Sequence, residues 1–121
     1  DWVEDGWDLE QSIALSDKLK SLGVDLIDCS SGGAVAGVKV PTGPGYQTRF
    51  AEQIRQQASI PTGAVGLITS AEQADHIIRT GQADIVLLAR ELLRNPYWAI
   101  QAAKQLGHEK PNPIQYERAW T

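Results

Sequence analysis

The fold is decided by the stretch Gly23-Val24-Asp25-Leu26-Ile27-Asp28-Cys29, which has a counterpart later in the chain. The counterpart is Gly81-Gln82-Ala83-Asp84-Ile85-Val86, continued by Leu87-Leu88-Ala89. In each stretch a glycine suited to ending a helix leads into a short and mostly apolar run. Runs of this kind are typical of strands buried in a parallel sheet. The similarity of the two stretches indicates repeated units, each a helix followed by a strand.

The surrounding segments continue this alternation. Asp8 and Ser70 are good N-cap residues, and a glutamine three residues later, at Gln11 and Gln73, completes a capping box in each case. The pair Asn95-Pro96 is typical of a helix start, because the missing N–H of a first-turn proline costs nothing there. The sequence therefore predicts helices over residues 9–22, 47–58, 71–80 and 96–106, and strands over residues 24–29, 62–65 and 84–89.

Strands that alternate with helices of about ten or more residues predict right-handed crossovers and a parallel sheet. Three parallel strands alone would leave both sheet edges open. A (β/α)₈ barrel needs about 250 residues, so three units make up roughly three-eighths of it. We predict an α/β fold in which residues 1–107 form the last three βα units, parallel strands 6–8, of an incomplete TIM barrel. Residues 108–121 are predicted to be an extended C-terminal tail. A doubly wound sheet is the alternative, although no G-x-G-x-x-G motif follows any strand.

The composition of the chain bounds its role. With 121 residues, 15 acidic and 11 basic side chains and a net charge of -4, it has no basic surplus for nucleic-acid binding. The longest apolar run, residues 85–89, is far too short to cross a bilayer, and no signal-peptide pattern appears at the start of this sequence. The single cysteine, Cys29, fits a cytoplasmic location. The absence of methionine, and an opening at Asp1 without a preceding element, lead us to expect a fragment.

The candidate site lies where the predicted strands end. In parallel barrels the active site lies at the carboxyl ends of the strands, and the last two loops often bind a phosphate. The second strand ends in Val65-Gly66, and the third ends in Ala89 followed by Arg90. Small residues let backbone N–H groups approach an anion, a helix start adds its positive dipole end, and arginine adds a bidentate contact. This pattern predicts a phosphate site, with a surface ion pair as the alternative role for Arg90.

Other residues that could carry chemistry have ordinary structural explanations. Cys29 is expected to be a small core residue. Ser31, after the first strand, either contacts a cofactor or makes local hydrogen bonds within a turn. The aspartates at 25, 28 and 84 have no histidine or glutamate converging on them, so no metal site is predicted. No catalytic residue is predicted in this chain.

Five segments of the chain resemble, in order, segments of the old yellow enzyme family of flavin-dependent ene-reductases, in its branch of bacterial NADPH dehydrogenases. They run almost from end to end of the chain. These segments are residues 23–32, Pro44-Gly45-Tyr46-Gln47, Thr62-Gly63-Ala64-Val65-Gly66, Ala89-Arg90-Glu91-Leu92-Leu93-Arg94-Asn95-Pro96 and Gln115-Tyr116-Glu117-Arg118-Ala119-Trp120.

The resemblance implies strands 6–8 of a TIM barrel that holds FMN. It implies that the backbone at Val65 and Gly66, together with Ala89 and Arg90, holds the FMN phosphate, with Ser31 assisting. The family often has glycine where Ala89 stands, which puts a tight backbone approach there in doubt. Arg118 looks like the family's arginine finger, which enters the substrate site of a neighbouring subunit. The resemblance thus implies a homo-oligomer formed through the tail.

The activity that the resemblance implies belongs to the parent protein. NADPH would reduce the FMN, and the reduced flavin would deliver hydride to the β-carbon of an activated alkene such as an enone. The family's catalytic histidine pair and tyrosine would lie upstream, so the fragment alone is expected to be inactive. Two alternatives stay open: a non-catalytic fragment that self-associates through its open sheet edges, and a barrel that binds another phosphorylated ligand.

Overall fold

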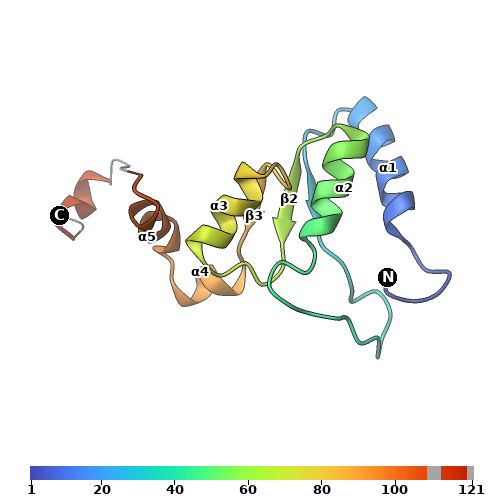
Figure 1. Cartoon of the computed structure of the whole chain (residues 1–121), viewed down its shortest axis with the longest axis horizontal. Coiled ribbons are helices and arrows are strands. Elements are labelled where there is room, and N and C mark those ends of the chain that lie inside the picture. Colours follow the sequence, from blue (N-terminus) through green and yellow to red (C-terminus); the bar gives the residue numbers. More distant parts are fainter. Residues whose placement is uncertain (109–112, 120–121) are drawn as a thin grey trace.

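The computed structural model describes residues 1–108 and 113–119 of the chain (Figure 1). Helices and strands alternate along it as the sequence predicts. The elements are α1 (Leu9–Ser21), β1 (Ile27–Cys29), α2 (Thr48–Ala58), β2 (Thr62–Val65), α3 (Ala71–Arg79), β3 (Ile85–Leu87), α4 (Arg90–Arg94), α5 (Trp98–Gln105) and the 3-10 helix η1 (Ile114–Ala119).

The three strands form one parallel sheet with β2 in the centre. Ala64 of β2 pairs with Cys29 on one side and with Val86 on the other. The predicted α/β fold with a parallel sheet is therefore confirmed. Within the described residues, β1 and β3 each have one strand neighbour, so both edges of the sheet are open.

One face of the sheet is covered by helices and carries the core. Ala51 of α2 and Ala64 of β2 are fully buried, and the Thr62 hydroxyl donates to the Ala51 carbonyl at 3.1 Å. Because side chains alternate along a strand, the neighbouring positions point to the other face. Ile85 lies on that other face and is 40% exposed. The sheet thus has a helix-covered face and a face that no described element covers.

Strand β2 spans the residues predicted for it, whereas β1 and β3 are shorter than predicted. β1 begins at Ile27 and β3 spans Ile85–Leu87, because β2 offers only four residues for pairing. Asp84, predicted to begin the third strand, instead turns its carboxylate to accept from the Thr62 amide at 2.9 Å. The adjacent residues Ile77 and Ile78 of α3 differ in burial. Ile77 is buried and Ile78 is not, because adjacent residues of a helix point about 100° apart.

The C-terminal third differs most from the prediction. Helix α4 was not predicted, and α5 begins at Trp98 rather than at residue 96, since the Asn95 side chain accepts from the Tyr97 amide at 3.2 Å and closes a turn there. The tail was predicted to be extended, but Ile114–Ala119 is a 3-10 helix. The boundary at residue 107 stays a prediction.

The helix starts are capped largely as predicted. Asp8 accepts from the Gln11 amide at 2.8 Å, and the Gln11 side chain accepts from the Asp8 amide at 2.9 Å, so this capping box is complete. The Ser70 hydroxyl accepts from the Gln73 amide, whereas the Gln73 side chain accepts from the Thr69 amide instead of closing the box. Across the described residues, no helix is long and apolar enough to cross a membrane.

Candidate anion site at the strand ends

The carboxyl ends of the three strands lie side by side. Parallel pairing aligns Cys29 with Ala64, and Val65 with Leu87. Ser31 therefore follows the end of β1 at the same level as the end of β2, and Ala89 follows the end of β3 next to it. The site residues predicted between positions 31 and 90 therefore lie at the carboxyl ends of the three strands, on one side of the sheet.

Gln47 joins the first two strand ends. Its side-chain carbonyl accepts from the Ser31 amide at 2.5 Å and from the Ser31 hydroxyl at 2.7 Å. Its amide nitrogen donates to the Val65 carbonyl at 3.2 Å. Gln47 is only 3% exposed and is the N-cap residue of α2. The side chain of Gln47 thereby ties the long loop after β1 to the end of β2, at the point where the loop ends and α2 begins.

Gly66 is the turning point at the end of β2. Its φ of +121° is unfavourable for residues with a side chain. A β-carbon at this position would lie 2.9 Å from the Tyr46 ring and 3.0 Å from the Gln47 amide nitrogen. The Gly66 carbonyl also accepts from the Gly45 amide at 2.9 Å. The glycine therefore permits both the turn and the close approach of the preceding loop.

Leu67 continues this unusual backbone with a φ of +51°. A left-handed conformation costs a side-chain-bearing residue roughly 1–2 kcal/mol. Strained residues of this kind concentrate at ligand sites, where surrounding structure holds them in place. Nothing in the sequence pattern marks Leu67 as a site residue, because leucine does not favour this conformation.

Arg90 is the first residue of α4 and its side chain is exposed. The surface ion pair considered for it is not formed with any described residue. The nearby Glu91 pairs with Arg94 instead, at 2.6 Å. Ala89 adopts φ -92° and ψ -79°, a conformation that does not require glycine. The alanine at this position therefore creates no backbone conflict.

The Ser31 side chain is already engaged. Its hydroxyl donates to Gln47 and accepts from the Trp2 indole N–H at 2.9 Å. A hydroxyl has one hydrogen to donate, and here Gln47 receives it. A direct contact between Ser31 and an anion would require this hydrogen bond to be exchanged.

Arg118 lies in η1, at the opposite end of the molecule from α1 (Figure 1). Its side chain is exposed and forms no ion pair with the residues that the structure describes. Two tyrosines connect η1 to the rest of the chain, since the rings of Tyr97 and Tyr116 are 6.4 Å apart. Trp120, which the sequence places beside Arg118, lies outside the described residues.

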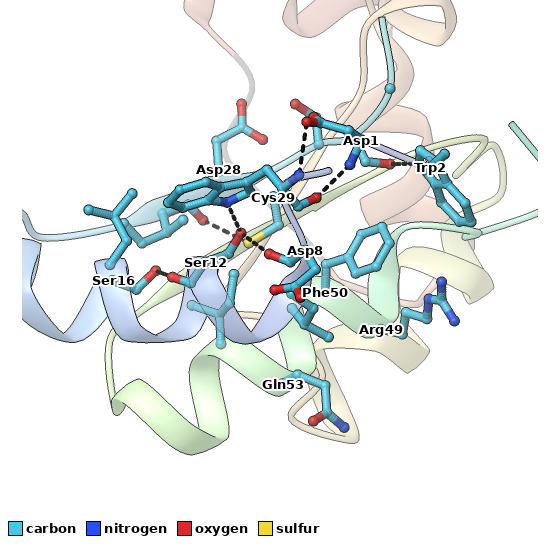
Figure 2. Close-up of a pocket in the computed structure, with 18 of the residues that line it drawn as sticks. Asp1, Trp2, Asp8, Ser12, Ser16, Asp28, Cys29, Arg49, Phe50 and Gln53 are labelled. Carbon is cyan, nitrogen blue, oxygen red and sulfur yellow. Dashed lines mark hydrogen bonds between the residues drawn. The ribbon is translucent and has the colours of Figure 1, made fainter. Parts of the chain in front are cut away.

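A cavity of about 850 Å³ lies beside β1 (Figure 2), and Arg90 is not among the residues that line it. The N-terminal segment, α1, β1 and α2 line it. Cys29 lines its floor and is buried, as predicted. Burial, and secondly the negative charge of Asp28, raise the pKa of the Cys29 thiol to about 11. The Cys29 thiol is therefore protonated at neutral pH, so Cys29 is not a reactive nucleophile in this cavity.

Comparison with known proteins establishes the family of this chain. Residues 1–109 match the model of the NADH:flavin oxidoreductase / NADH oxidase family. The chain belongs to this family. It is 51% identical to an NADPH dehydrogenase of Bacillus velezensis, 52% to one of Geobacillus thermodenitrificans and 49% to one of Bacillus subtilis, in each case over 120 residues. Each match covers 99% of this chain but 35% of the relative, so the chain spans about a third of the length of these flavin-family relatives.

The family relationship gives the strand ends their context. Pairing and hydrogen bonding bring together Ser31, Val65 and Gly66, and the register places Ala89 and Arg90 beside them. Arg118 is not brought to this edge by any contact within the described residues. Gln47 was missed as a site residue, although it lies in one of the segments that carry the family resemblance. A glutamine at a helix start is usually solvated, and only its burial reveals its role.

Proposed function

We propose that this chain is the phosphate-binding third of an FMN-dependent NADPH dehydrogenase, in which it supplies strands 6–8 of a (β/α)₈ barrel. The open edges of β1 and β3 and the uncovered sheet face support this, because a closed barrel would pair both edges and fill that face. The cavity beside β1 lies where a preceding strand would join the sheet. The family of the chain supports the same arrangement.

The observation that carries the proposal is the juxtaposition of Gly66 and Arg90 at adjacent strand ends. Gly66 and Leu67 turn the backbone sharply, and Arg90 offers a guanidinium that no described acid neutralises. A phosphate fits this donor set, because guanidinium and backbone N–H groups are its preferred partners. When bound, FMN would supply hydride chemistry, with NADPH as the reductant and an activated alkene such as an enone as the substrate. The residues of this chain would hold the phosphate and orient the cofactor.

The decisive test is Arg90→Ala in the full-length protein that carries this chain. Hydrogen bonds to charged groups contribute about 1.5–3 kcal/mol, so the Kd for FMN should rise roughly 10- to 150-fold. Riboflavin, which has no phosphate, should bind with unchanged affinity. Arg94→Ala is the matched control, because Arg94 lies on the same helix and pairs with Glu91. Equal FMN affinity in the two variants would show that Arg90 does not bind the phosphate.

We further propose that the full-length protein is a homo-oligomer assembled through the tail, with Arg118 acting in the substrate site of a neighbouring subunit. Leu93 is 83% exposed and Ile114 is 74% exposed, so α4 and η1 present apolar surface that a partner subunit would cover. Arg118→Ala should then raise the KM for the enone and leave FMN affinity unchanged. An unaltered KM would remove Arg118 from the substrate site.

A further inference from the structure

We infer that Gln47 is the positioning residue of the phosphate site, and that it sets the spacing between the ends of β1 and β2. This inference rests on the proposed function, because it assigns the role of Gln47 through the cofactor phosphate. Gln47 makes no described contact with Arg90. It acts on Ser31, Val65 and Gly66, which lie at the neighbouring strand ends.

The orientation of the Gln47 amide is fixed by its partners. The Ser31 backbone N–H can only donate, so it requires the side-chain carbonyl of Gln47. The Val65 carbonyl can only accept, so it requires the side-chain NH₂ group. Turning the amide over would set two donors against each other on one side and two acceptors on the other. The Gln47 side chain thus accepts from a donor in the loop after β1 and donates to an acceptor on β2 at the same time.

Burial makes these hydrogen bonds costly to lose. Gln47 is 3% exposed, so a polar group that loses its partner here stays buried without a hydrogen bond. An apolar residue here would leave the Ser31 amide without the partner it has in this structure. The connection also extends outward, because the Ser31 hydroxyl accepts from the Trp2 indole at 2.9 Å. The N-terminal segment, the loop after β1 and the end of β2 therefore share one hydrogen-bond network.

Gln47 also limits where Gly66 can lie. Its amide nitrogen occupies the space that a Gly66 side chain would need, at 3.0 Å from the β-carbon position. A side chain on Gly66 would therefore collide with the Gln47 amide in the position from which it donates to Val65 at 3.2 Å. The backbone amides beyond Gly66 are consequently aimed by Gln47, although Gln47 itself need not touch the phosphate.

The test compares Gln47→Glu and Gln47→Met in the full-length flavoprotein, with FMN and riboflavin affinities measured at pH 7.5 and pH 5. A carboxylate keeps the two Ser31 contacts, loses the donor to Val65 and adds negative charge near the phosphate. We expect the Gln47→Glu variant to bind FMN at least ~10-fold more weakly than the wild-type protein at pH 7.5. Burial raises the pKa of a carboxyl group, so at pH 5 the protonated side chain can donate to Val65 again. FMN affinity relative to wild type should then recover.

The methionine variant separates positioning from charge. It has similar length but no hydrogen-bonding amide, so its FMN affinity should be low at both pH values without recovery. Riboflavin affinity should change little in either variant, because the effect acts through the phosphate loop. If both variants bind FMN as wild type does while Arg90→Ala binds weakly, the positioning role is wrong and the phosphate site stands. If Arg90→Ala also binds normally, the phosphate assignment itself fails. Equal losses of FMN and riboflavin would indicate a general structural role and overturn the inference.

Discussion

Gly66 is the residue on which the geometry of the strand ends depends most directly. Alanine there would keep the strained φ of +121° and place a methyl group 2.9 Å from the Tyr46 ring. Gly33→Ala is a matched control, since Gly33 also has a positive φ but nothing within 4 Å of its β-carbon position. Backbone strain of this kind costs about 1–3 kcal/mol, and the clash adds to it only at Gly66. Urea unfolding of the full-length protein should show the larger loss for Gly66→Ala, and equal losses would mean that the contact with Tyr46 relaxes without cost.

The Cys29 thiol should react slowly with alkylating reagents, because it is buried and its pKa is raised. A pKa of about 11 leaves far less thiolate at pH 8 than an unfolded cysteine has, whose pKa is about 8.5. Because the thiolate is the nucleophile, iodoacetamide should modify Cys29 of the folded full-length protein on the order of 100-fold more slowly than Cys29 of the urea-unfolded protein. Peptide mass spectrometry over time measures both rates. Comparable rates would show that the thiol is neither buried nor shifted.

The sequence could reveal only part of the site, for reasons that individual residues illustrate. The placement of Gly66 and Arg90 after neighbouring strands was predictable, because apolar runs mark the strands that precede them. Gln47 was not, because its importance comes from two partners, Ser31 and Val65, that are 16 and 18 residues away. Leu67 was not predictable because its strain is imposed by the loop around it.

At the scale of elements, β2 and β3 are joined at their amino ends by Asp84. Its carboxylate accepts from the Thr62 amide at 2.9 Å and from the Arg55 side chain at 3.0 Å, and Arg55 also donates to the Gly81 carbonyl. Burial alone would raise the pKa of Asp84, but the hydrogen bonds from Arg55 and Thr62 and the charge of Arg55 outweigh it, so the pKa is lowered. The pair connects α2 to the start of β3.

The lowered pKa of Asp84 determines the direction in which its contribution to stability changes with pH. The stabilisation is fully present above the unfolded pKa of about 3.9 and is lost as the pH falls through the lower folded value. Asp84→Asn removes the ionisable group but keeps an oxygen for the Thr62 amide. Its melting temperature should therefore fall less than that of wild type between pH 5 and pH 3, as measured by differential scanning calorimetry. Parallel curves would mean that Asp84 does not contribute to this pH dependence.

The elements themselves were more predictable than their ends. Three parallel strands and the helices between them follow from apolar runs and caps such as Asp8 with Gln11. Strand ends depend on which neighbour is available for pairing, which is why β1 loses residues 24–26. Helix α4 has five residues, too few for a periodic apolar pattern, so the sequence carries no signal for it.

Over the whole molecule, the open sheet predicts how these 121 residues should behave when expressed alone. Ile85 is 40% exposed on the uncovered face, and β1 borders a cavity of about 850 Å³. We expect a colourless, loosely packed monomer that binds the dye anilinonaphthalene sulfonate, because no described element covers this face of the sheet. Analytical ultracentrifugation and dye fluorescence test this. A stable flavin-free dimer would instead support self-association through the edges, and a yellow sample would show that these 121 residues suffice for flavin binding.

The contacts of Asp84 also have a practical consequence, because they lie at the opposite end of the strands from Arg90. In the proposed barrel, residues at the amino ends of the strands would serve stability, whereas those at the carboxyl ends would serve chemistry. A directed-evolution library can therefore randomise the loops beyond Gly66 and Ala89 for new ligand preference while Arg55 and Asp84 are kept constant. Stabilising substitutions can be collected separately around Asp84 and combined afterwards, since sites far apart contribute almost additively. The two ends of one small sheet can thus be optimised as independent modules.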